Sequence, residues 1–275
     1  MTLSSLLARC VNELRDAGAA NPRLDAELLI VHALKLPRHV FLADPNREIS
    51  ESAAASCAPL VARRAKREPL AYITGTREFF GLDFAVDSRV LIPRPETELL
   101  VEAAIGLLPK NGSLLDICTG SGAVAVAVAH ERPDCSVTGS DISGGALAVA
   151  KRNGDALVQG RVRFVQSDLF AAFEGVRFDV VTANPPYIDP SLEASLQTEL
   201  SFEPGLALYA PDAGREIIRR IVRDVKGVLV EGGALAMEIG FDQGEFVRGL
   251  AKDARAECRI GKDLAGHDRC MIVRF

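Results

Sequence analysis

From residue 114 to the last residue, short apolar segments alternate with amphipathic ones, and this alternation limits the possible folds more than any other feature. The extended apolar segments lie at 114–117, 136–140, 162–166, 178–183, 234–239, 256–260 and 270–275. Apolar residues at helical spacing fill the gaps at 122–131, 143–153, 213–229 and 243–252. The pattern predicts an α/β fold with a seven-stranded, mostly parallel, doubly wound Rossmann-like sheet. The last two segments lie too close together for a crossover helix, so we expect the last strand to be reversed.

Residues 1–75 have a different pattern, which predicts a small N-terminal helical domain. Apolar residues recur at helical spacing from Thr2 to Ala17, Asn21-Pro22 opens a second helix, and Ser50 caps a third that ends near residue 67. The end of this third helix carries four cations, Arg63, Arg64, Lys66 and Arg67. They suit either a solvated surface or a docking patch for an anionic partner. We expect a β-hairpin linker over 76–92 and the sheet domain over 93–275, opened by a helix from about residue 96 to 108.

The charge and composition of the chain exclude several classes of protein. Of its 275 residues, 32 are Lys or Arg and 37 are Asp or Glu, which gives a net charge of −5. This balance, with no Trp and 5% aromatic residues, argues against direct binding of nucleic acid through a basic groove and stacking rings. The six cysteines form no CxxC pattern and have no His partner at ligand spacing. We therefore expect neither a disulfide framework nor a metal site.

No segment of the sequence predicts export or membrane insertion. Charged residues interrupt the first turns of the chain, which therefore lack the apolar core of a signal peptide. The longest run of small apolar residues, Ala123 to Ala129, is far shorter than the ~20 residues that span a bilayer. We expect a soluble, cytoplasmic protein.

A glycine turn follows the first predicted strand of the sheet and is typical of a nucleotide-type site. Its residues are Asp116, Cys118, Thr119, Gly120, Ser121 and Gly122. Asp141 ends the next strand, where an acidic residue accepts hydrogen bonds from ribose hydroxyls. Because Gly120, Gly122 and Ala125 also fit the G-x-G-x-x-A pattern of dinucleotide sites, the turn alone fits NAD as well as S-adenosylmethionine. Glycines that serve only a tight turn are the simplest alternative.

The carboxylate of Asp116 favours S-adenosylmethionine as the ligand of this turn. It carries an amino group and a sulfonium in place of a pyrophosphate, so Asp116 would attract it and repel a diphosphate. After the third strand, Asp168 is placed to accept from the adenine amino group and Leu169 to cover the ring. A helix N-cap is an equally good interpretation of Asp168.

The tetrapeptide Asn184-Pro185-Pro186-Tyr187 follows the fourth strand, at the edge where open α/β sheets bind ligands. Neither proline has an N–H, and Pro186 restricts Pro185 to an extended conformation, so the Pro185 carbonyl is held rigidly and left free to accept. The side-chain oxygen of Asn184 is a second acceptor. Two fixed acceptors suit a planar NH2 group, against which Tyr187 would pack. An ordinary Pro-Pro turn is the alternative.

The chemistry of a planar nitrogen explains why two acceptors are useful. Such a nitrogen shares its lone pair with a π-system and is a poor nucleophile. Acceptors on both N–H groups draw it toward tetrahedral geometry and stabilise the positive charge that grows on it during attack. With the methyl group on a sulfonium, transfer then needs in-line positioning and no strong general base. These residues therefore predict methyl transfer to an amide or aromatic amine nitrogen, with Asn184, Pro185, Pro186 and Tyr187 as catalytic residues.

Together with Leu91-Ile92-Pro93-Arg94-Pro95-Glu96-Thr97-Glu98, these motifs resemble those of the bacterial peptide chain release factor glutamine N5-methyltransferases, the HemK or PrmC family. The resemblance extends over nearly the whole chain. It implies a class I methyltransferase sheet and methyl transfer from S-adenosylmethionine to the glutamine amide of the Gly-Gly-Gln motif in class I release factors. It also implies that residues 1–75 recognise this protein substrate.

The same resemblance implies the roles of individual residues. The loop from Cys118 to Gly122 would hold the cofactor, Asp141 its ribose and Leu169 its adenine, while the tetrapeptide from Asn184 to Tyr187 would bind the glutamine and Asn184 would also touch the cofactor. The chain departs from the pattern at Cys118, where many members have Gly, and at Leu169, where some have an aromatic residue. The Cys118 variant of the loop also resembles enzymes that methylate ribosomal protein L3, whereas the Pro-Arg-Pro-Glu-Thr-Glu stretch favours the release-factor branch.

Three other functions remain as rival hypotheses. The tetrapeptide is shared with nucleic-acid amino methyltransferases acting on adenine N6 or guanine N2, although residues 1–75 do not look like their target-recognition domains. A non-catalytic module that only binds release factors would use the same cleft. A nicotinamide oxidoreductase would explain the G-x-G-x-x-A match.

Overall fold

The structure, a computed structural model, describes residues 1–275, which divide into two compact units. The helical unit comprises Met1–Thr76 together with Gln197–Phe202, and the sheet unit comprises Arg77–Leu196 and Glu203–Phe275. The short segment Gln197–Phe202 is therefore grouped with helices that lie far away in the sequence. None of the helices has the length and apolar character that crossing a membrane requires.

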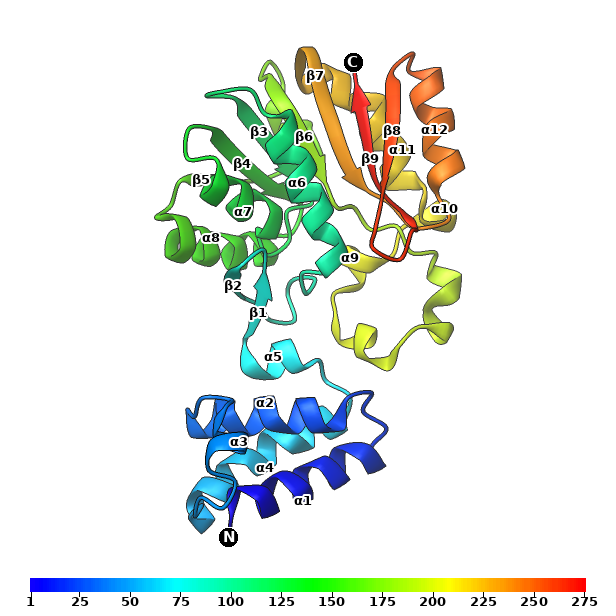
Figure 1. Cartoon of the computed structure of the whole chain (residues 1–275). Coiled ribbons are helices and arrows are strands. Elements are labelled where there is room, and N and C mark those ends of the chain that lie inside the picture. The colour runs from blue at the N-terminus through cyan, green and yellow to red at the C-terminus, as the bar shows by residue number, and fades with distance from the viewer. The chain divides into compact units, whose positions relative to one another are not determined.

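The helical unit confirms the helical domain predicted at the N-terminus. Its elements are α1 (Leu3–Asp16), α2 (Pro22–Leu34), α3 (Val40–Ala43), α4 (Glu51–Ala65) and α5 (Leu70–Thr74), blue to cyan in Figure 1, with the 3-10 helix η4 (Thr198–Phe202). Thr2 and Ser50 cap α1 and α4, since their side-chain oxygens accept hydrogen bonds from backbone N–H groups three residues on. The inward faces of the helices form a separate apolar core, with Leu3, Leu6, Leu14, Leu29, Ile30 and Val61 among its members.

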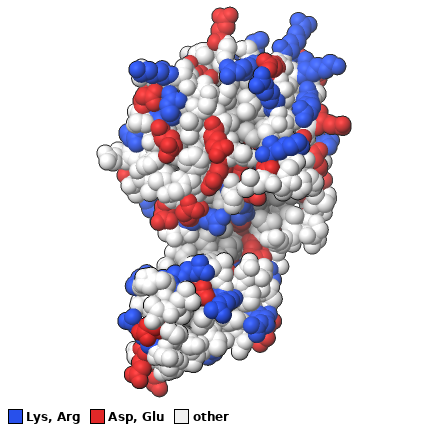
Figure 2. Space-filling model, in the orientation of Figure 1, with Lys and Arg blue, Asp and Glu red and all other residues white.

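Three of the four cations at the end of α4 are engaged within the helical unit, and the first of them, Arg63, pairs with Glu68. The buried Arg64 pairs with Asp25 at 2.7 Å between Nε and Oδ2. Arg64 and Arg67 also hold Glu199, at 3.1 and 2.8 Å between nitrogen and oxygen. They anchor the segment Gln197–Phe202 and are not a free basic patch. Figure 2 shows basic and acidic side chains interspersed over the visible face.

A two-stranded sheet of β1 (Thr76–Phe79) and β2 (Leu82–Ala85) confirms the predicted hairpin. Phe80 and Gly81, which join the strands, both have positive φ, as a two-residue hairpin turn of type I′ requires. Residues 86–94 form no strand, although the hairpin was expected to extend to residue 92. The 3-10 helix η1 (Pro95–Thr97) and α6 (Glu98–Leu107) follow, which confirms a helix after the two prolines.

The sheet unit is built on seven strands. They are β3 (Ser113–Ile117), β4 (Ser136–Asp141), β5 (Val162–Gln166), β6 (Phe178–Ala183), β7 (Leu229–Glu238), β8 (Glu257–Lys262) and β9 (Asp268–Arg274). Their order is β5-β4-β3-β6-β7-β9-β8; β9 runs antiparallel to both neighbours, and the remaining pairs are parallel. The structure thus confirms the predicted α/β sheet with a reversed last strand (Figure 1).

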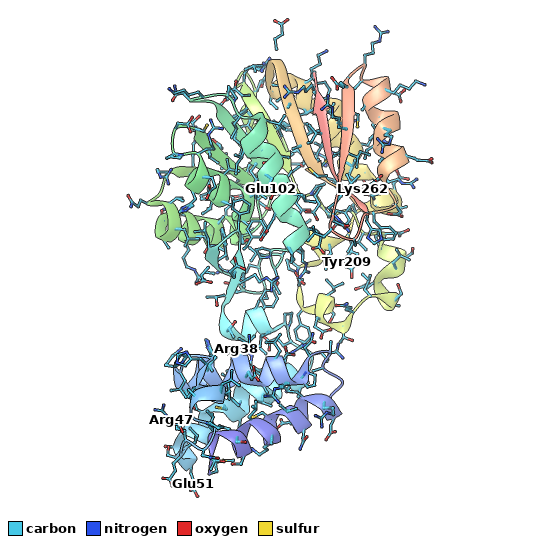
Figure 3. The ribbon with its side chains drawn as sticks, viewed as in Figure 1. Arg38, Arg47, Glu51, Glu102, Tyr209 and Lys262 are labelled. Atoms are coloured by element: carbon cyan, nitrogen blue, oxygen red, sulfur yellow. The ribbon has the colours of Figure 1, made fainter.

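Helices cover both faces of this sheet. The helices α6, α7 (Ala123–Glu131) and α8 (Gly144–Val158) contribute to the core on one face, and α11 (Glu216–Asp224) and α12 (Gly244–Asp253) to the core on the other. Successive strand residues point to opposite faces, so Leu114 joins the first core and Leu115 the second. The side chains drawn in Figure 3 fill the space between these layers. A sheet buried on both faces presents only its edges and strand ends to a ligand.

The remaining elements are short, and most lie where the sequence predicted nothing. They are η2 (Ala171–Phe173), η3 (Pro190–Ser195), α9 (Gly205–Leu208), α10 (Pro211–Gly214) and η5 (Val225–Val228). One helix was expected over 213–229, but Gly214 has a φ of +76°, so α11 begins after it. The predicted helix also ends early, because its last turn is the 3-10 helix η5 and β7 already begins at residue 229.

Candidate active site

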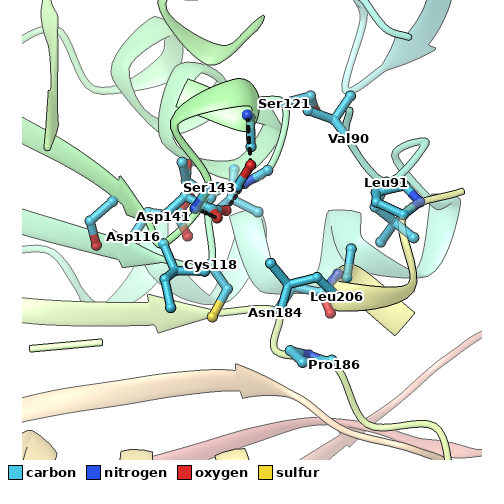
Figure 4. A pocket seen from close by; sticks show the side chains of 18 of the residues that line it. Val90, Leu91, Asp116, Cys118, Ser121, Asp141, Ser143, Asn184, Pro186 and Leu206 are labelled. Atoms are coloured by element: carbon cyan, nitrogen blue, oxygen red, sulfur yellow. Dashed lines mark hydrogen bonds between the residues drawn. The ribbon is translucent and has the colours of Figure 1, made fainter. Parts of the chain in front are cut away.

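A cavity of about 320 Å³ opens at the carboxyl ends of β3, β4 and β6. Because β3 lies between β4 and β6, this edge is the topological switch point at which doubly wound sheets bind ligands. The predicted site residues that line the cavity are Asp116, Cys118, Thr119, Gly120, Ser121, Asp141, Asp168, Leu169, Asn184 and Pro186, several of which are labelled in Figure 4. Gly122, Pro185 and Tyr187 do not line it.

The turn after β3 is shaped by three residues with left-handed backbone. Cys118, Gly120 and Gly122 have φ values of +55°, +56° and +80°. A Cβ on Gly120 would meet no atom within 4 Å, whereas one on Gly122 would lie 3.2 Å from Cβ of Ala150 in α8. Gly120 therefore leaves room for a ligand, and Gly122 allows α7 to pack closely on α8. Cys118 adopts a conformation that costs a non-glycine residue roughly 1–2 kcal/mol, which explains the glycine that the family resemblance leads one to expect there.

The Asp141 carboxylate holds this turn to the end of β4 (Figure 4). Its two oxygens accept hydrogen bonds from the backbone N–H groups of Gly120 and Ser143, both at 2.9 Å. Ser143 in turn caps α8 through its hydroxyl oxygen. Each carboxylate oxygen has a further lone pair, so the half-buried Asp141 can also accept from the hydroxyls of a ligand.

Asp116 is buried at the end of β3, in the wall of the cavity. One of its oxygens accepts from the hydroxyl of Thr119 at 2.6 Å and the other from the hydroxyl of Thr182 at 2.8 Å. Burial raises the pKa of Asp116 to about 6, and the two hydroxyl groups oppose that rise. Thr182 is a support that the sequence did not reveal, because it lies on β6 and meets Asp116 only through strand pairing.

The charges around the cavity fit S-adenosylmethionine better than a dinucleotide. Asp116, Asp141 and Asp168 line it, and burial together with these carboxylates raises the pKa of the Cys118 thiol. Both arginines that line it are already paired with carboxylates. The N–H of Gly120, which a pyrophosphate would use, donates to Asp141. An amino group and a sulfonium would find negative charge here, whereas a pyrophosphate would be repelled.

The turn after β5 carries the residues predicted to lie at the adenine. Nη2 of Arg220 donates to both oxygens of Asp168, at 3.0 and 2.9 Å, so Asp168 pairs with an arginine and does not cap a helix. Leu169 is buried against the cavity, and the Ser167 hydroxyl donates to its carbonyl oxygen at 2.9 Å. The contacts of Asp168 and Leu169 with adenine stay predictions. Arg220 was not predicted, because it lies 52 residues further on, in α11, where nothing in the helical pattern distinguishes it.

Asn184, directly after β6, is held by a short chain of hydrogen bonds. Its Nδ2 donates to Oγ1 of Thr97 at 3.2 Å, and the Thr97 hydroxyl lies 2.6 Å from Oε2 of Glu238. The hydroxyl of Tyr187 donates to the other oxygen of Glu238 at 3.0 Å. Burial raises the pKa of Glu238, while the two hydroxyls lower it. Asn184 therefore has its NH2 group turned away to Thr97, which leaves Oδ1 as its unpaired polar atom.

Gln243 and Gly214 fix the backbone of the tetrapeptide. Nε2 of the buried Gln243 donates to the carbonyl oxygens of Tyr187 and Gly214, at 3.2 and 3.3 Å. A Cβ on Gly214 would lie 2.0 Å from the Tyr187 carbonyl oxygen, so only glycine fits there. The Pro185 carbonyl accepts no hydrogen bond from the protein, in agreement with the expected free acceptor. Because the Tyr187 hydroxyl points to Glu238, its packing against a substrate stays a prediction.

The stretch from Pro93 to Glu98 also proves to support this edge. Arg94 pairs with the buried Glu203, which accepts a second hydrogen bond from the N–H of Ile92 at 2.9 Å. The Thr97 hydroxyl oxygen accepts the hydrogen bond from Nδ2 of Asn184. The sequence identified this stretch only by its resemblance to the family, since the partners of Ile92, Arg94 and Thr97 at this edge lie 87 or more residues away.

Comparison with known proteins identifies relatives of both units. The family model described as PrmC N-terminal domain matches residues 5–75, and that described as Methyltransferase small domain matches residues 95–201. The release factor glutamine methyltransferase of Salmonella typhimurium (strain LT2) is 38% identical over 277 residues, which cover 100% of this chain and 99% of that protein. That of Burkholderia pseudomallei (strain K96243) is 44% identical over 258 residues, which cover 90% of each.

A solved structure supports the fold alone. A methyltransferase from Pyrococcus furiosus aligns with a TM-score of 0.56 at 19% identity, covering 78% of this chain and 98% of that one. The sequence relatives show the family as well as the fold, because they match both the helical unit and the sheet unit over their full lengths. The chain therefore belongs to the release factor glutamine methyltransferases.

Proposed function

We propose that this protein transfers a methyl group from S-adenosylmethionine to the side-chain amide nitrogen, N5, of the glutamine in the Gly-Gly-Gln motif of class I peptide chain release factors. One observation carries the proposal: Asn184 Oδ1 and the Pro185 carbonyl are two unpaired acceptors on the tetrapeptide that ends β6. A primary amide has two N–H groups that match them. The names of the full-length relatives support the release factor as the substrate.

The residues of the glycine turn, Asp141, Asp168 and Leu169 would hold S-adenosylmethionine, with Asn184 at the border between cofactor and substrate. When bound, S-adenosylmethionine supplies a methyl group that is activated by its attachment to a positively charged sulfur. The carboxylates of the cavity match this charge. The closed wall on the Asp116 side excludes water from that charge, because Asp116, Thr119 and Ser121 are all buried.

The acceptors raise the reactivity of the glutamine nitrogen. Asn184 Oδ1 and the Pro185 carbonyl accept its two N–H groups, hold the nitrogen in line and stabilise the positive charge that develops on it. Neither acceptor is basic enough to keep a proton, so the extra proton leaves the methylated nitrogen to water. Electrostatic preorganisation and positioning carry this mechanism, and no side chain acts as a strong base.

The helical unit is our candidate for recognition of the release factor, since it packs around its own core and lies outside the cavity. Because release factors act at the ribosome, the cytoplasm is the proposed place of action.

The purified protein, labelled S-adenosylmethionine and a release factor test this function. We expect label in the release factor and none in DNA, RNA or ribosomal protein L3. In Asn184→Ala, labelling should fall at least about 100-fold while binding of the release factor persists, because a lost acceptor removes transition-state stabilisation and little docking surface. Label in L3 or nucleic acid would move the substrate to the corresponding rival. Equal loss of labelling and binding would favour a binding module, and tight binding of NADH without S-adenosylmethionine would favour an oxidoreductase.

A further inference from the structure

We propose that Thr97 and Glu238 are positioning residues that fix which end of the Asn184 carboxamide faces the substrate. The inference rests on the proposed function, because it explains how the site presents an acceptor to an amide N–H. Neither residue would touch the reacting atoms. Both act through Asn184, and their contribution is to the rate of transfer.

The carboxamide of Asn184 has two ends of nearly the same shape and opposite polarity. With Oδ1 toward the substrate, it accepts an N–H of the glutamine. With Nδ2 there, two donors oppose each other, and the positive charge that develops on the glutamine nitrogen loses its stabilisation. A half-turn of the carboxamide would therefore abolish the function of Asn184 without moving any backbone.

The Thr97 hydroxyl decides between these two orientations. It has one hydrogen and lies between Oε2 of Glu238, at 2.6 Å, and Nδ2 of Asn184, at 3.2 Å. A carboxylate only accepts, and a short O–H···O⁻ contact is typical of a charge-assisted hydrogen bond. The hydrogen of Thr97 therefore points to Glu238, and only a lone pair remains for Asn184. Only the NH2 end of Asn184 can satisfy that lone pair.

Both carboxylate oxygens of Glu238 act as acceptors. Its other oxygen accepts from the Tyr187 hydroxyl at 3.0 Å, so each carboxylate oxygen receives one hydroxyl. Glu238 and Thr97 are only 2% and 4% exposed, so water does not compete for these bonds. The acceptor role of Glu238 thus fixes the direction of the Thr97 hydrogen bond, which in turn fixes the orientation of Asn184, and water does not interrupt this chain.

Thr97 lies where the 3-10 helix η1 continues into α6, and its own backbone is helical, with φ −68° and ψ −15°. Its side chain makes no hydrogen bond to a backbone N–H of the first turn of α6. No capping bond therefore competes with the contact of the hydroxyl to Glu238.

The test compares Thr97→Val with Thr97→Ser in the full-length protein, using a release factor and labelled S-adenosylmethionine. Valine keeps the shape and removes the hydroxyl, so we expect kcat to fall roughly 10- to 100-fold, with KM for the release factor and Kd for S-adenosylmethionine within about threefold. Serine restores the hydroxyl and should keep kcat within about threefold. Thr138→Val in β4, a threonine that lies outside the cavity, is the matched control.

Two further variants separate positioning from mere support of the fold. Gln at position 238 offers one acceptor to two hydroxyls, so Glu238→Gln should lower kcat in the same way with cofactor Kd retained. In the Asn184→Ala background, Thr97→Val should change the residual rate by less than about twofold, because its effect passes through Asn184. A full additional loss in that background, or wild-type kcat in Thr97→Val, would overturn the inference. Failure of the wild-type protein to label any release factor would instead overturn the proposed function.

Discussion

Two parts of the site are each built on a buried carboxyl that accepts from two hydroxyls, yet they are assembled differently. In the cofactor half, which consists of the glycine turn, Asp116 and Asp141, the partners of Asp116 are Thr119, three residues away, and Thr182. Thr182 is the residue paired with Asp116 in the register of β3 and β6. In the amide half, which consists of Asn184, Tyr187, Thr97 and Glu238, the partners of Glu238 lie 141 and 51 residues away.

This difference shows what secures each half. Strand pairing and a tight turn place the acceptors of the cofactor half, so its geometry follows from the sheet itself. The amide half depends on side chains that meet across loops, with Gln243 and Gly214 fixing the loop backbone. We therefore expect a single substitution outside the tetrapeptide to disable the amide half while the cofactor half still binds its ligand.

Gly214→Ala should disable the amide half, and we expect it to lower activity more than any other substitution outside the tetrapeptide. The added Cβ would lie 2.0 Å from the carbonyl oxygen of Tyr187, so the tetrapeptide must move. A displacement of about 1 Å in the reacting groups can lower a rate about 100-fold, and we expect at least that loss of release-factor methylation. Labelling kinetics measure the rate, and calorimetric titration should give a Kd for S-adenosylmethionine within about threefold of the wild-type value.

Gly175→Ala is the matched control for this substitution. Gly175 has a φ of +75°, almost the same as the +76° of Gly214, but its Cβ would meet no atom within 4 Å. Both variants carry the same backbone strain, and only Gly214→Ala carries the clash. Equal activities of the two variants would show that the amide half does not depend on this contact.

The same difference explains what could be predicted from the sequence. Strands β3 to β6 were placed within one residue, because each is a short apolar run bounded by turns. Asp116, the glycine turn and Asp141 were found because their chemistry lies in one continuous strand-turn-helix-strand pattern. Asn184 was found because the two prolines beside it mark the position.

The supports of the amide half could not be found in this way. In the sequence, Glu238 looks like any polar residue at the end of a strand, and Gln243 like any polar residue at the start of a helix. The helical spacing predicts that Gly214 is part of a helix, since nothing in the local sequence shows that a distant carbonyl oxygen occupies the space of a Cβ. Long-range contacts between loops leave no period in the sequence, so such residues appear only in the structure.

Asp141→Asn should weaken the cofactor half alone, and we expect its effect to be smaller than that of Gly214→Ala. The carboxylate accepts two backbone N–H groups, whereas asparagine offers one oxygen and opposes the other N–H with its own. Loss of one such bond costs about 1.5 kcal/mol, so we expect Kd for S-adenosylmethionine to rise about tenfold. At saturating cofactor, kcat should stay within about twofold, because Asn184 and its supports are unchanged. An equal fall in kcat would show that the two halves are not independent.

The last effect concerns how the buried Asp116 carboxyl alters the stability of the fold. The pKa of Asp116 is raised to about 6 from 3.8, so folding favours its protonated form. As pH rises through this window, the unfolded chain releases the proton first, and stability is lost until the folded carboxyl also ionises. Asp116 therefore opposes folding more at pH 8 than at pH 5. An asparagine side chain at this position would not titrate and can pair with both threonine hydroxyls.

Urea unfolding of the wild-type protein and Asp116→Asn, at about pH 5 and pH 8 without S-adenosylmethionine, measures this effect. The difference in free energy of unfolding should shift in favour of the variant by about 1 kcal/mol between the two pH values. Glu238 and the remaining carboxyls are present in both proteins, so their titration cancels. The same difference at both pH values would mean that Asp116 titrates normally and that the cofactor half is not built on a desolvated acid. A shift that saturating S-adenosylmethionine abolishes would show that its positive charge is what this carboxylate stabilises.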